Sequence, residues 1–302
     1  MRLNLLTIYF WGFWVNPKRK YTSSAVYALV FGLLSSASSC TSQKVVTSTN
    51  IRAINVPAKL LEVDNLGRIY VVDNRNDLIN YRPDMTEQYR YANRRSGHIS
   101  SIDLTNPLKV VVYYDDFNQV KILDNTLSII SELNLNDFYA DISACSSSND
   151  GNLWIYDPIN FKLKKVNDEG TTLIESSNTN DFGLQSAYIT RIIERNNLVV
   201  LFDVNQGFFI FDNLGQFVFR YQSLSVTYWN FEGGFIHSYN PNEPDIVTKL
   251  DINSLDIQQL KIPYTATENL KTLDVNPLKV ILKSNKFYLM YADGIDVLKR
   301  AE

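Results

Sequence analysis

Six short segments of the chain repeat one pattern, and this repeat limits the possible folds more than any other feature. In each, an apolar, aromatic-rich stretch leads into an Asp or Asn turn, and a second strand follows, as in IYVVDNRNDLINYRPD and VVLFDVNQGFFIFDNLG. The turn residues are Asp73, Asp115, Asp157, Asp203, Asn240 and Asp293. Their spacings are 42, 42, 46, 37 and 53 residues, and because the last two together make two average units, no unit is missing.

Each unit also has an apolar strand before it, such as LLEVDNLG, and another after it, such as TEQYRYA. Four strands in roughly 45 residues, joined by turns rich in Asn, Asp and Gly, are the dimension of a propeller blade. We therefore predict an all-β, six-bladed β-propeller over residues 57–302. A seven-bladed propeller or a pair of β-sandwiches are the alternatives.

The two ends of the repeat region complement one another. The sixth unit stops after its third strand, at DVLKR, whereas the strand-like segment KVVTSTNIRAI at residues 44–54 belongs to no blade. A ring closes without an unpaired edge if an N-terminal strand completes the last blade. We expect that closure here.

The units IYVVDNRNDLINYRPDM and VVLFDVNQGFFIFDNLGQF resemble the repeats of the NHL-like group of six-bladed propellers. The resemblance covers nearly all of the chain after the N-terminal segment. It departs from the family at the regular arginine, since Leu78 and Phe208 stand near the place where a positive residue is expected.

The N-terminal segment has the order of a secretory signal peptide. The basic cluster NPKRK precedes a ten-residue apolar or small run at residues 25–34, which is short for a membrane span, and small residues follow. We assign residues 1–39 to this signal. A second apolar run, LLTIYFWGFWV, precedes the basic cluster, and we interpret it as a sign that translation starts near Val15.

The string ASSC, ending at Cys40, resembles the lipobox of bacterial lipoproteins, with Ala37 in place of the usual Leu. The resemblance implies lipidation of Cys40, with residues 40–56 as tether and closing strand. A plain signal peptide or an uncleaved anchor is the alternative. Thr41 after the cysteine favours the outer membrane, so we expect a lipid-anchored protein there, facing the periplasm or the cell surface.

Composition narrows the partners. After removal of residues 1–39, 25 basic residues face 32 acidic ones, a formal charge of −7, which argues against nucleic-acid binding. The other cysteine, Cys145, has no second thiol to pair with if Cys40 is lipidated, so we expect a small buried residue at a strand end.

The six turn residues are the candidate polar-face site. Converging carboxylate and amide oxygens suit a calcium ion or a cationic ligand. Asp and Asn also cap tight turns by bonding to the backbone, and their recurrence in every blade favours this structural role. Calcium-dependent lactonase propellers share the predicted shape, but no four positions here match their Glu, two Asn and Asp, although Glu62, Asn152 and Asp203 lie at plausible blade positions.

His237 follows a Gly-Gly pair that could bring its imidazole near the central channel, although packing within a strand is the commoner role of such a residue. With only His98 besides, the histidines offer neither metal-ligand spacing nor a triad. We predict no cofactor, with calcium as an open alternative. We predict a non-enzymatic binding, scaffold or accessory subunit of a bacterial envelope complex that works with other envelope proteins. The alternatives are a metal-dependent, lactonase-like hydrolase and a glycan-binding protein.

Overall fold

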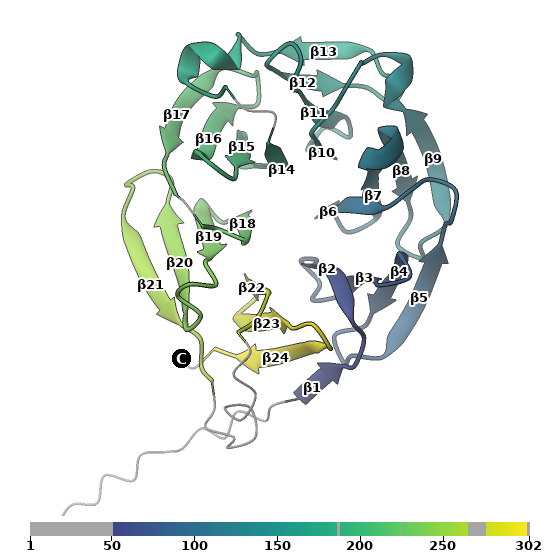
Figure 1. Ribbon diagram of the computed structural model, residues 1–302, viewed down its shortest axis with the longest axis vertical. Helices are drawn as coiled ribbons and strands as arrows, with labels where there is room; N and C mark the ends of the chain where they lie inside the picture. The colour runs from purple at the N-terminus through teal and green to yellow at the C-terminus, as the bar shows by residue number, and fades with distance from the viewer. Residues whose placement is uncertain (1–50, 186–187, 224, 265–275, 301–302) are drawn as a thin grey trace, which may run out of the picture. The chain divides into compact units, whose positions relative to one another are not determined.

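The computed structural model describes residues 51–300, apart from 186–187, 224 and 265–275. These residues form a ring of six sheets of four antiparallel strands each around a central axis (Figure 1). The prediction of a six-bladed β-propeller is confirmed, and the seven-bladed and sandwich alternatives are wrong. Within the described chain, no helix is long and apolar enough to cross a membrane.

The first three blades run in chain order from the axis outwards. Blade 1 contains β2 (Ala58–Val63), β3 (Ile69–Asp73), β4 (Asp77–Tyr81) and β5 (Glu87–Ala92). Blade 2 contains β6 (Ile99–Asn106), β7 (Lys109–Tyr114), β8 (Gln119–Leu123) and β9 (Ile129–Asn134). Blade 3 contains β10 (Ala144–Ser147), β11 (Leu153–Asp157), β12 (Lys162–Val166) and β13 (Thr172–Glu175).

The remaining blades follow the same plan. Blade 4 contains β14 (Ile189–Arg195), β15 (Leu198–Asp203), β16 (Gly207–Asp212) and β17 (Phe217–Tyr221). Blade 5 contains β18 (Tyr228–Glu232), β19 (Phe235–Tyr239), β20 (Ile246–Asp251) and β21 (Ile257–Lys261). Blade 6 contains β22 (Lys279–Lys283), β23 (Lys286–Met290) and β24 (Ile295–Lys299). Short 3₁₀ turns are η1 (Asp115–Phe117), η2 (Leu135–Asp137) and η3 (Thr179–Phe182).

The fourth strand of blade 6 comes from the other end of the chain. β1 (Ile51–Ile54) pairs with β24 in antiparallel register, with Ile51 opposite Val297 and Ile54 opposite Ile295. The predicted closure is therefore confirmed for residues 51–54. Residues 44–50 of the predicted closing segment, the signal peptide and Cys40 lie outside the described residues.

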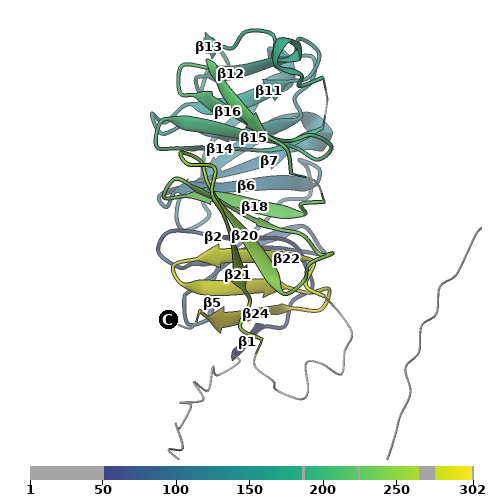
Figure 2. The same cartoon turned by 90° about the vertical axis from the view of Figure 1, so that its left-hand side faces the viewer.

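The apolar core lies between the blades. The second strands, such as KVVVYY of β7, are buried on both faces because each blade packs against two neighbours, so they read as continuous apolar runs. The outer strands are largely exposed, as in β9 and β21. Aromatic side chains fill the space between blades, with Trp154 and Trp229 almost fully buried. Figure 2 shows the same ring from the side.

Candidate functional site

The first strands of the blades surround a central cavity of about 460 Å³. They are β2, β6, β10, β14, β18 and β22, and each contributes at least one residue to the lining. In β14, the lining includes Thr190, Arg191, Ile192, Ile193 and Arg195. Glu194 is not part of it and bonds to blade 3.

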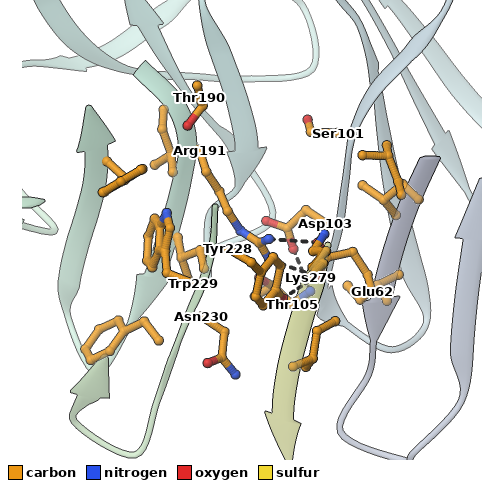
Figure 3. A pocket seen from close by; sticks show the side chains of 18 of the residues that line it. Glu62, Ser101, Asp103, Thr105, Thr190, Arg191, Tyr228, Trp229, Asn230 and Lys279 are labelled. Atoms are coloured by element: carbon orange, nitrogen blue, oxygen red, sulfur yellow. Dashed lines mark hydrogen bonds and ion pairs between the residues drawn. The ribbon is translucent and has the colours of Figure 1, made fainter. Parts of the chain in front are cut away.

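A buried carboxylate and two cations form the centre of this cavity. Glu62 of β2 accepts a bidentate pair from Arg191 of β14, with Nη1–Oε1 at 2.7 Å and Nη2–Oε2 at 2.9 Å. Lys279 of β22 donates to Oε1 at 3.1 Å, and the Tyr228 hydroxyl of β18 donates to Oε2 at 2.9 Å (Figure 3). One carboxylate thus joins four blades, and its two oxygens accept four hydrogen bonds.

Burial and charge act in opposite directions on these groups. Burial alone would raise the pKa of Glu62, but Arg191 and Lys279 overcome it and hold this pKa at about 2. Burial lowers the pKa of Lys279 to about 8, with Glu62 opposing the shift and Arg191 adding to it. The pKa of Tyr228 is raised, chiefly by burial. Glu62 is therefore firmly ionised at neutral pH, and Lys279 titrates near neutrality.

A second carboxylate on the lining is also saturated. Asp103 of β6 accepts the Thr105 N–H at 2.6 Å through Oδ1. Through Oδ2 it accepts the Ser147 N–H at 3.0 Å and the Ser146 hydroxyl. Neither Asp103 nor Glu62 has a carboxylate oxygen without a protein donor.

The lining holds more cations than carboxylates. Arg191, Arg195, Lys279 and Lys283 line the cavity, against Glu62 and Asp103. Lys283 lies 3.8 Å from its nearest acid, the partly exposed Glu232. Burial lowers the pKa of Lys283, as does the charge of Arg195, while Glu232 opposes the shift. Glu62 and Asp64 also oppose the shift, from further away than Glu232. Lys283 and Arg195 are thus neighbouring cations at this end of the cavity.

Two buried polar groups on the lining have no hydrogen-bond partner among the described residues. They are Nε1 of Trp229 and Oδ1 of Asn230. Trp229 is 2 % exposed and Asn230 is 7 % exposed, so neither is freely solvated in the folded chain. Buried polar atoms usually have partners, so these two atoms are exceptions. Both are covered by protein, so a molecule in the cavity does not reach them in this conformation.

The described residues contain no group of three or more His, Cys, Asp or Glu side chains that could hold a metal ion. Glu62 has the position that a calcium-ligating carboxylate would need, but its oxygens already accept N–H and O–H donors. The described residues of the cavity therefore offer no set of ligands for the calcium ion that we kept as an alternative.

The six predicted turn residues do not line the cavity, and the structure gives most of them a role in the turn between the second and third strands. Asp73, Asp157, Asp203 and Asn240 each accept a backbone N–H from the second residue that follows, at 2.8–3.1 Å. Asp115 begins η1, and Asp293 lies between β23 and β24. The geometry is that of turn capping.

His237 lies on β19, the second strand of blade 5, and is not among the residues that line the cavity. The expected position near the channel is not found because the Gly-Gly pair precedes a second strand and not an axial one. Burial, with Lys249 and Arg300 nearby, lowers the pKa of His237 to about 4. Cys145 is 5 % exposed, as expected for a small packing residue.

Sequence reasoning did not single out Arg191, Tyr228 or Lys279, and it gave Glu62 no role. The signal that could have found them is a charge within an apolar first strand, as in LLEV, ITRII and LKVILK. Burying such a charge is costly unless it is paired, so each one predicts a partner from another blade.

No protein-family model matches this chain, and no curated protein sequence does. Among solved structures, virginiamycin B lyase from Staphylococcus aureus is similar over 84 % of this chain and 98 % of its own, with 11 % identity and a TM-score of 0.54. The WD40 domain of Neurospora crassa Pan2 is similar over 82 % of this chain and 90 % of its own, at 11 % identity and a TM-score of 0.56. A streptogramin B lyase matches over 79 % of this chain and 78 % of its own, at 13 % identity and a TM-score of 0.52. At these identities the likeness establishes the propeller fold alone.

Proposed function

We propose that this protein is a binding propeller whose central cavity takes a small anionic molecule. The observation that carries the proposal is the charge of the lining, where four cations face two carboxylates whose oxygens are all bonded. An entering ligand meets cationic donors and no free carboxylate oxygen. The volume of about 460 Å³ lies within the usual range of small-molecule sites.

The Lys283 end of the cavity is the best place for the negative group. The charge of Arg195 repels that of Lys283 and lowers the pKa of Lys283. An anion between the two side chains would relieve this repulsion. We therefore expect a ligand with a carboxylate or phosphate group.

A metal-dependent hydrolase is a weaker proposal. Such an enzyme needs free oxygen ligands that converge, and the carboxylate nearest the axis, Glu62, is taken by Arg191, Lys279 and Tyr228. The same cations would repel a divalent ion. A neutral glycan would leave the cation surplus without a role.

The experiment is a thermal-shift and calorimetric titration of the full chain with phosphate, citrate and sulfate, and with calcium for contrast. We expect the anions to raise the melting temperature, since a ligand that binds only the native state stabilises it. Lys283→Met should weaken anion binding about ten-fold or more, the worth of one charge-assisted hydrogen bond. The control is Lys59→Met, at an exposed position outside the lining, which should bind as the parent does. Stabilisation by calcium alone, or anion binding that is indifferent to Lys283, would contradict the proposal.

A second proposal concerns where the propeller works. The basic cluster, the apolar run and ASSC ending at Cys40 support a lipid-anchored protein of the bacterial outer membrane that serves an envelope complex as scaffold or accessory subunit. Labelled palmitate should enter the parent chain and not the Cys40→Ser variant. Gentle detergent extraction followed by mass spectrometry should recover other envelope proteins in fixed proportion. Recovery of the unlabelled chain alone would argue against both parts.

A further inference from the structure

One end of blade 6 carries a row of cationic side chains, most of which form no ion pair with another described residue. Lys283 of β22 lies opposite Lys286 of β23, which lies opposite Lys299 of β24, and Arg300 follows directly. We call Lys286, Lys299 and Arg300 the blade 6 cluster. Lys299 and Arg300 are exposed and Lys286 is half-buried.

Like charges at directly opposed positions of neighbouring strands destabilise a sheet. Among the described residues, none of the three cluster members forms an ion pair, whereas Lys121, Lys164 and Lys165 on other third strands each do. Glu232 forms an ion pair at this end of the sheet, but its partner is Lys283, at 3.8 Å, and not a member of the cluster. Within the described part of the chain, no ion pair offsets this repulsion.

The N-terminal strand begins at the same end of blade 6. β1 runs antiparallel to β24, with Ile51 opposite Val297, so the first residue of β1 lies near the end of β24 that holds Lys299. Lys299 lies two residues beyond Val297, a distance of about 7 Å along the strand. The eleven steps from Cys40 to Ile51 can span at most about 40 Å. A lipid on Cys40 would hold this end of the ring close to the bilayer.

We propose that the blade 6 cluster docks the propeller on an anionic phospholipid surface, with the end of blade 6 at Lys299 facing the bilayer. The inference rests on the proposed lipid anchor for proximity, and it adds an orientation that the anchor alone does not impose. Attraction to anionic headgroups contributes about five-fold in partition for each Lys or Arg near the surface, or on the order of 100-fold for three. The attraction falls off within about 10 Å, so only the end that holds the cluster responds.

The test uses the full chain reconstituted in vesicles, with a dye on one introduced cysteine and a quencher on the lipid headgroups. Ser284→Cys reports the blade 6 end, since Ser284 lies between Lys283 and Lys286 and is exposed. Ser177→Cys reports an exposed site at the opposite end of the strands, after β13. Vesicles of phosphatidylcholine alone are compared with vesicles that contain phosphatidylglycerol.

We expect stronger quenching at position 284 than at 177 with phosphatidylglycerol and a loss of this contrast with phosphatidylcholine alone. The triple variant Lys286→Gln, Lys299→Gln, Arg300→Gln should lose the contrast. The matched control Lys59→Gln, Arg95→Gln, Lys261→Gln neutralises three exposed cations at the other end of the strands and should keep it. Equal quenching at both positions, or equal loss in both triple variants, would overturn the inference.

Retention on phosphatidylcholine vesicles reports the anchor separately, because a lipid chain inserts whatever the headgroup. If the protein leaves these vesicles but still shows the quenching contrast with phosphatidylglycerol, the result refutes the lipid anchor and supports the docking surface. If the protein is retained but shows no quenching contrast, the result refutes the docking surface and supports the lipid anchor. Preferential binding of a soluble polyanion such as heparin over anionic vesicles would identify a different partner and overturn the inference.

Discussion

Two buried glutamates on axial strands of this ring have opposite surroundings. Glu62 of β2 bonds to two cations and a tyrosine from three other blades. Among the described residues, Glu194 of β14 bonds to neutral donors of blade 3, namely the Ser148 hydroxyl at 2.6 Å, Trp154 Nε1 at 2.7 Å and Asn149. Glu194 is a latch between two neighbouring blades, whereas Glu62 joins blades across the cavity and balances the charges there.

The difference separates a contact that joins two blades from one that sets the charge of the cavity. Arg191 lines the cavity, whereas Glu194 of the same strand is not part of the lining and bonds to blade 3. A carboxylate satisfied by neutral donors needs no cation, so Glu194 leaves the charge of the cavity unchanged. Glu62 neutralises only one of the two cations it holds, and this leaves a positive surplus for a ligand.

The largest expected effect is the loss of the Glu62 charge. Glu62→Ala leaves Arg191 and Lys279 buried side by side without their shared partner, and removal of one partner from a buried ion pair costs about 3–5 kcal/mol. The free energy of unfolding in urea should fall by that amount. Glu243→Ala, at an exposed turn position, should stay within about 0.5 kcal/mol of the parent. A small effect of Glu62→Ala would mean that the cations find other partners.

Acid should remove the same stabilisation without a mutation. The pKa of Glu62 is about 2 in the folded chain against 4.5 as a free side chain. Because the folded value is the lower one, its contribution is present above pH 4.5 and is lost as the pH falls toward 2. The shift corresponds to about 3 kcal/mol. Unfolding curves of the parent and Glu62→Gln between pH 6 and 2 should converge at the acid end, and parallel curves would contradict this.

A substitution of Glu194 should reduce stability less than a substitution of Glu62. Glu194→Gln keeps one acceptor oxygen but turns an amide toward the Ser148, Asn149 and Trp154 donors, which costs about 1–3 kcal/mol in unmade hydrogen bonds. The free energy of unfolding should fall by less than in Glu62→Ala, and anion binding should be unchanged. Weaker anion binding in Glu194→Gln would mean that the two glutamates are not separate in role.

The smallest expected effect is on affinity at alkaline pH. Lys279 has a pKa of about 8, so its charge is present below pH 8 and is lost as the pH rises above it. Affinity for phosphate or citrate should fall about ten-fold between pH 7 and 9.5, the worth of one charged donor. In Lys279→Met the affinity should be lower at pH 7 and depend less on pH. Calorimetry at both pH values checks this, and an equal pH dependence in the variant would assign it to another group.

Local patterns in the amino-acid sequence were enough to predict the ring. The recurring Asp turns, the continuous apolar second strands and the unmatched segment before Ile54 are local patterns, and each corresponds to an element that the structure contains. The turn residues could be predicted because capping depends on backbone atoms only two or three positions away.

The pairing of charges across the cavity could not be predicted in this way. Glu62 lies 129 residues from Arg191 and 217 from Lys279, and no local pattern relates positions so far apart. Their meeting depends on closure of the ring and on which face of each first strand is turned to the axis. Bulges between Ala58 and Leu60 and between Ile189 and Arg191 set that face, because one extra residue moves the side chains after it to the other side of the strand. The cavity and its charge follow from this arrangement in space.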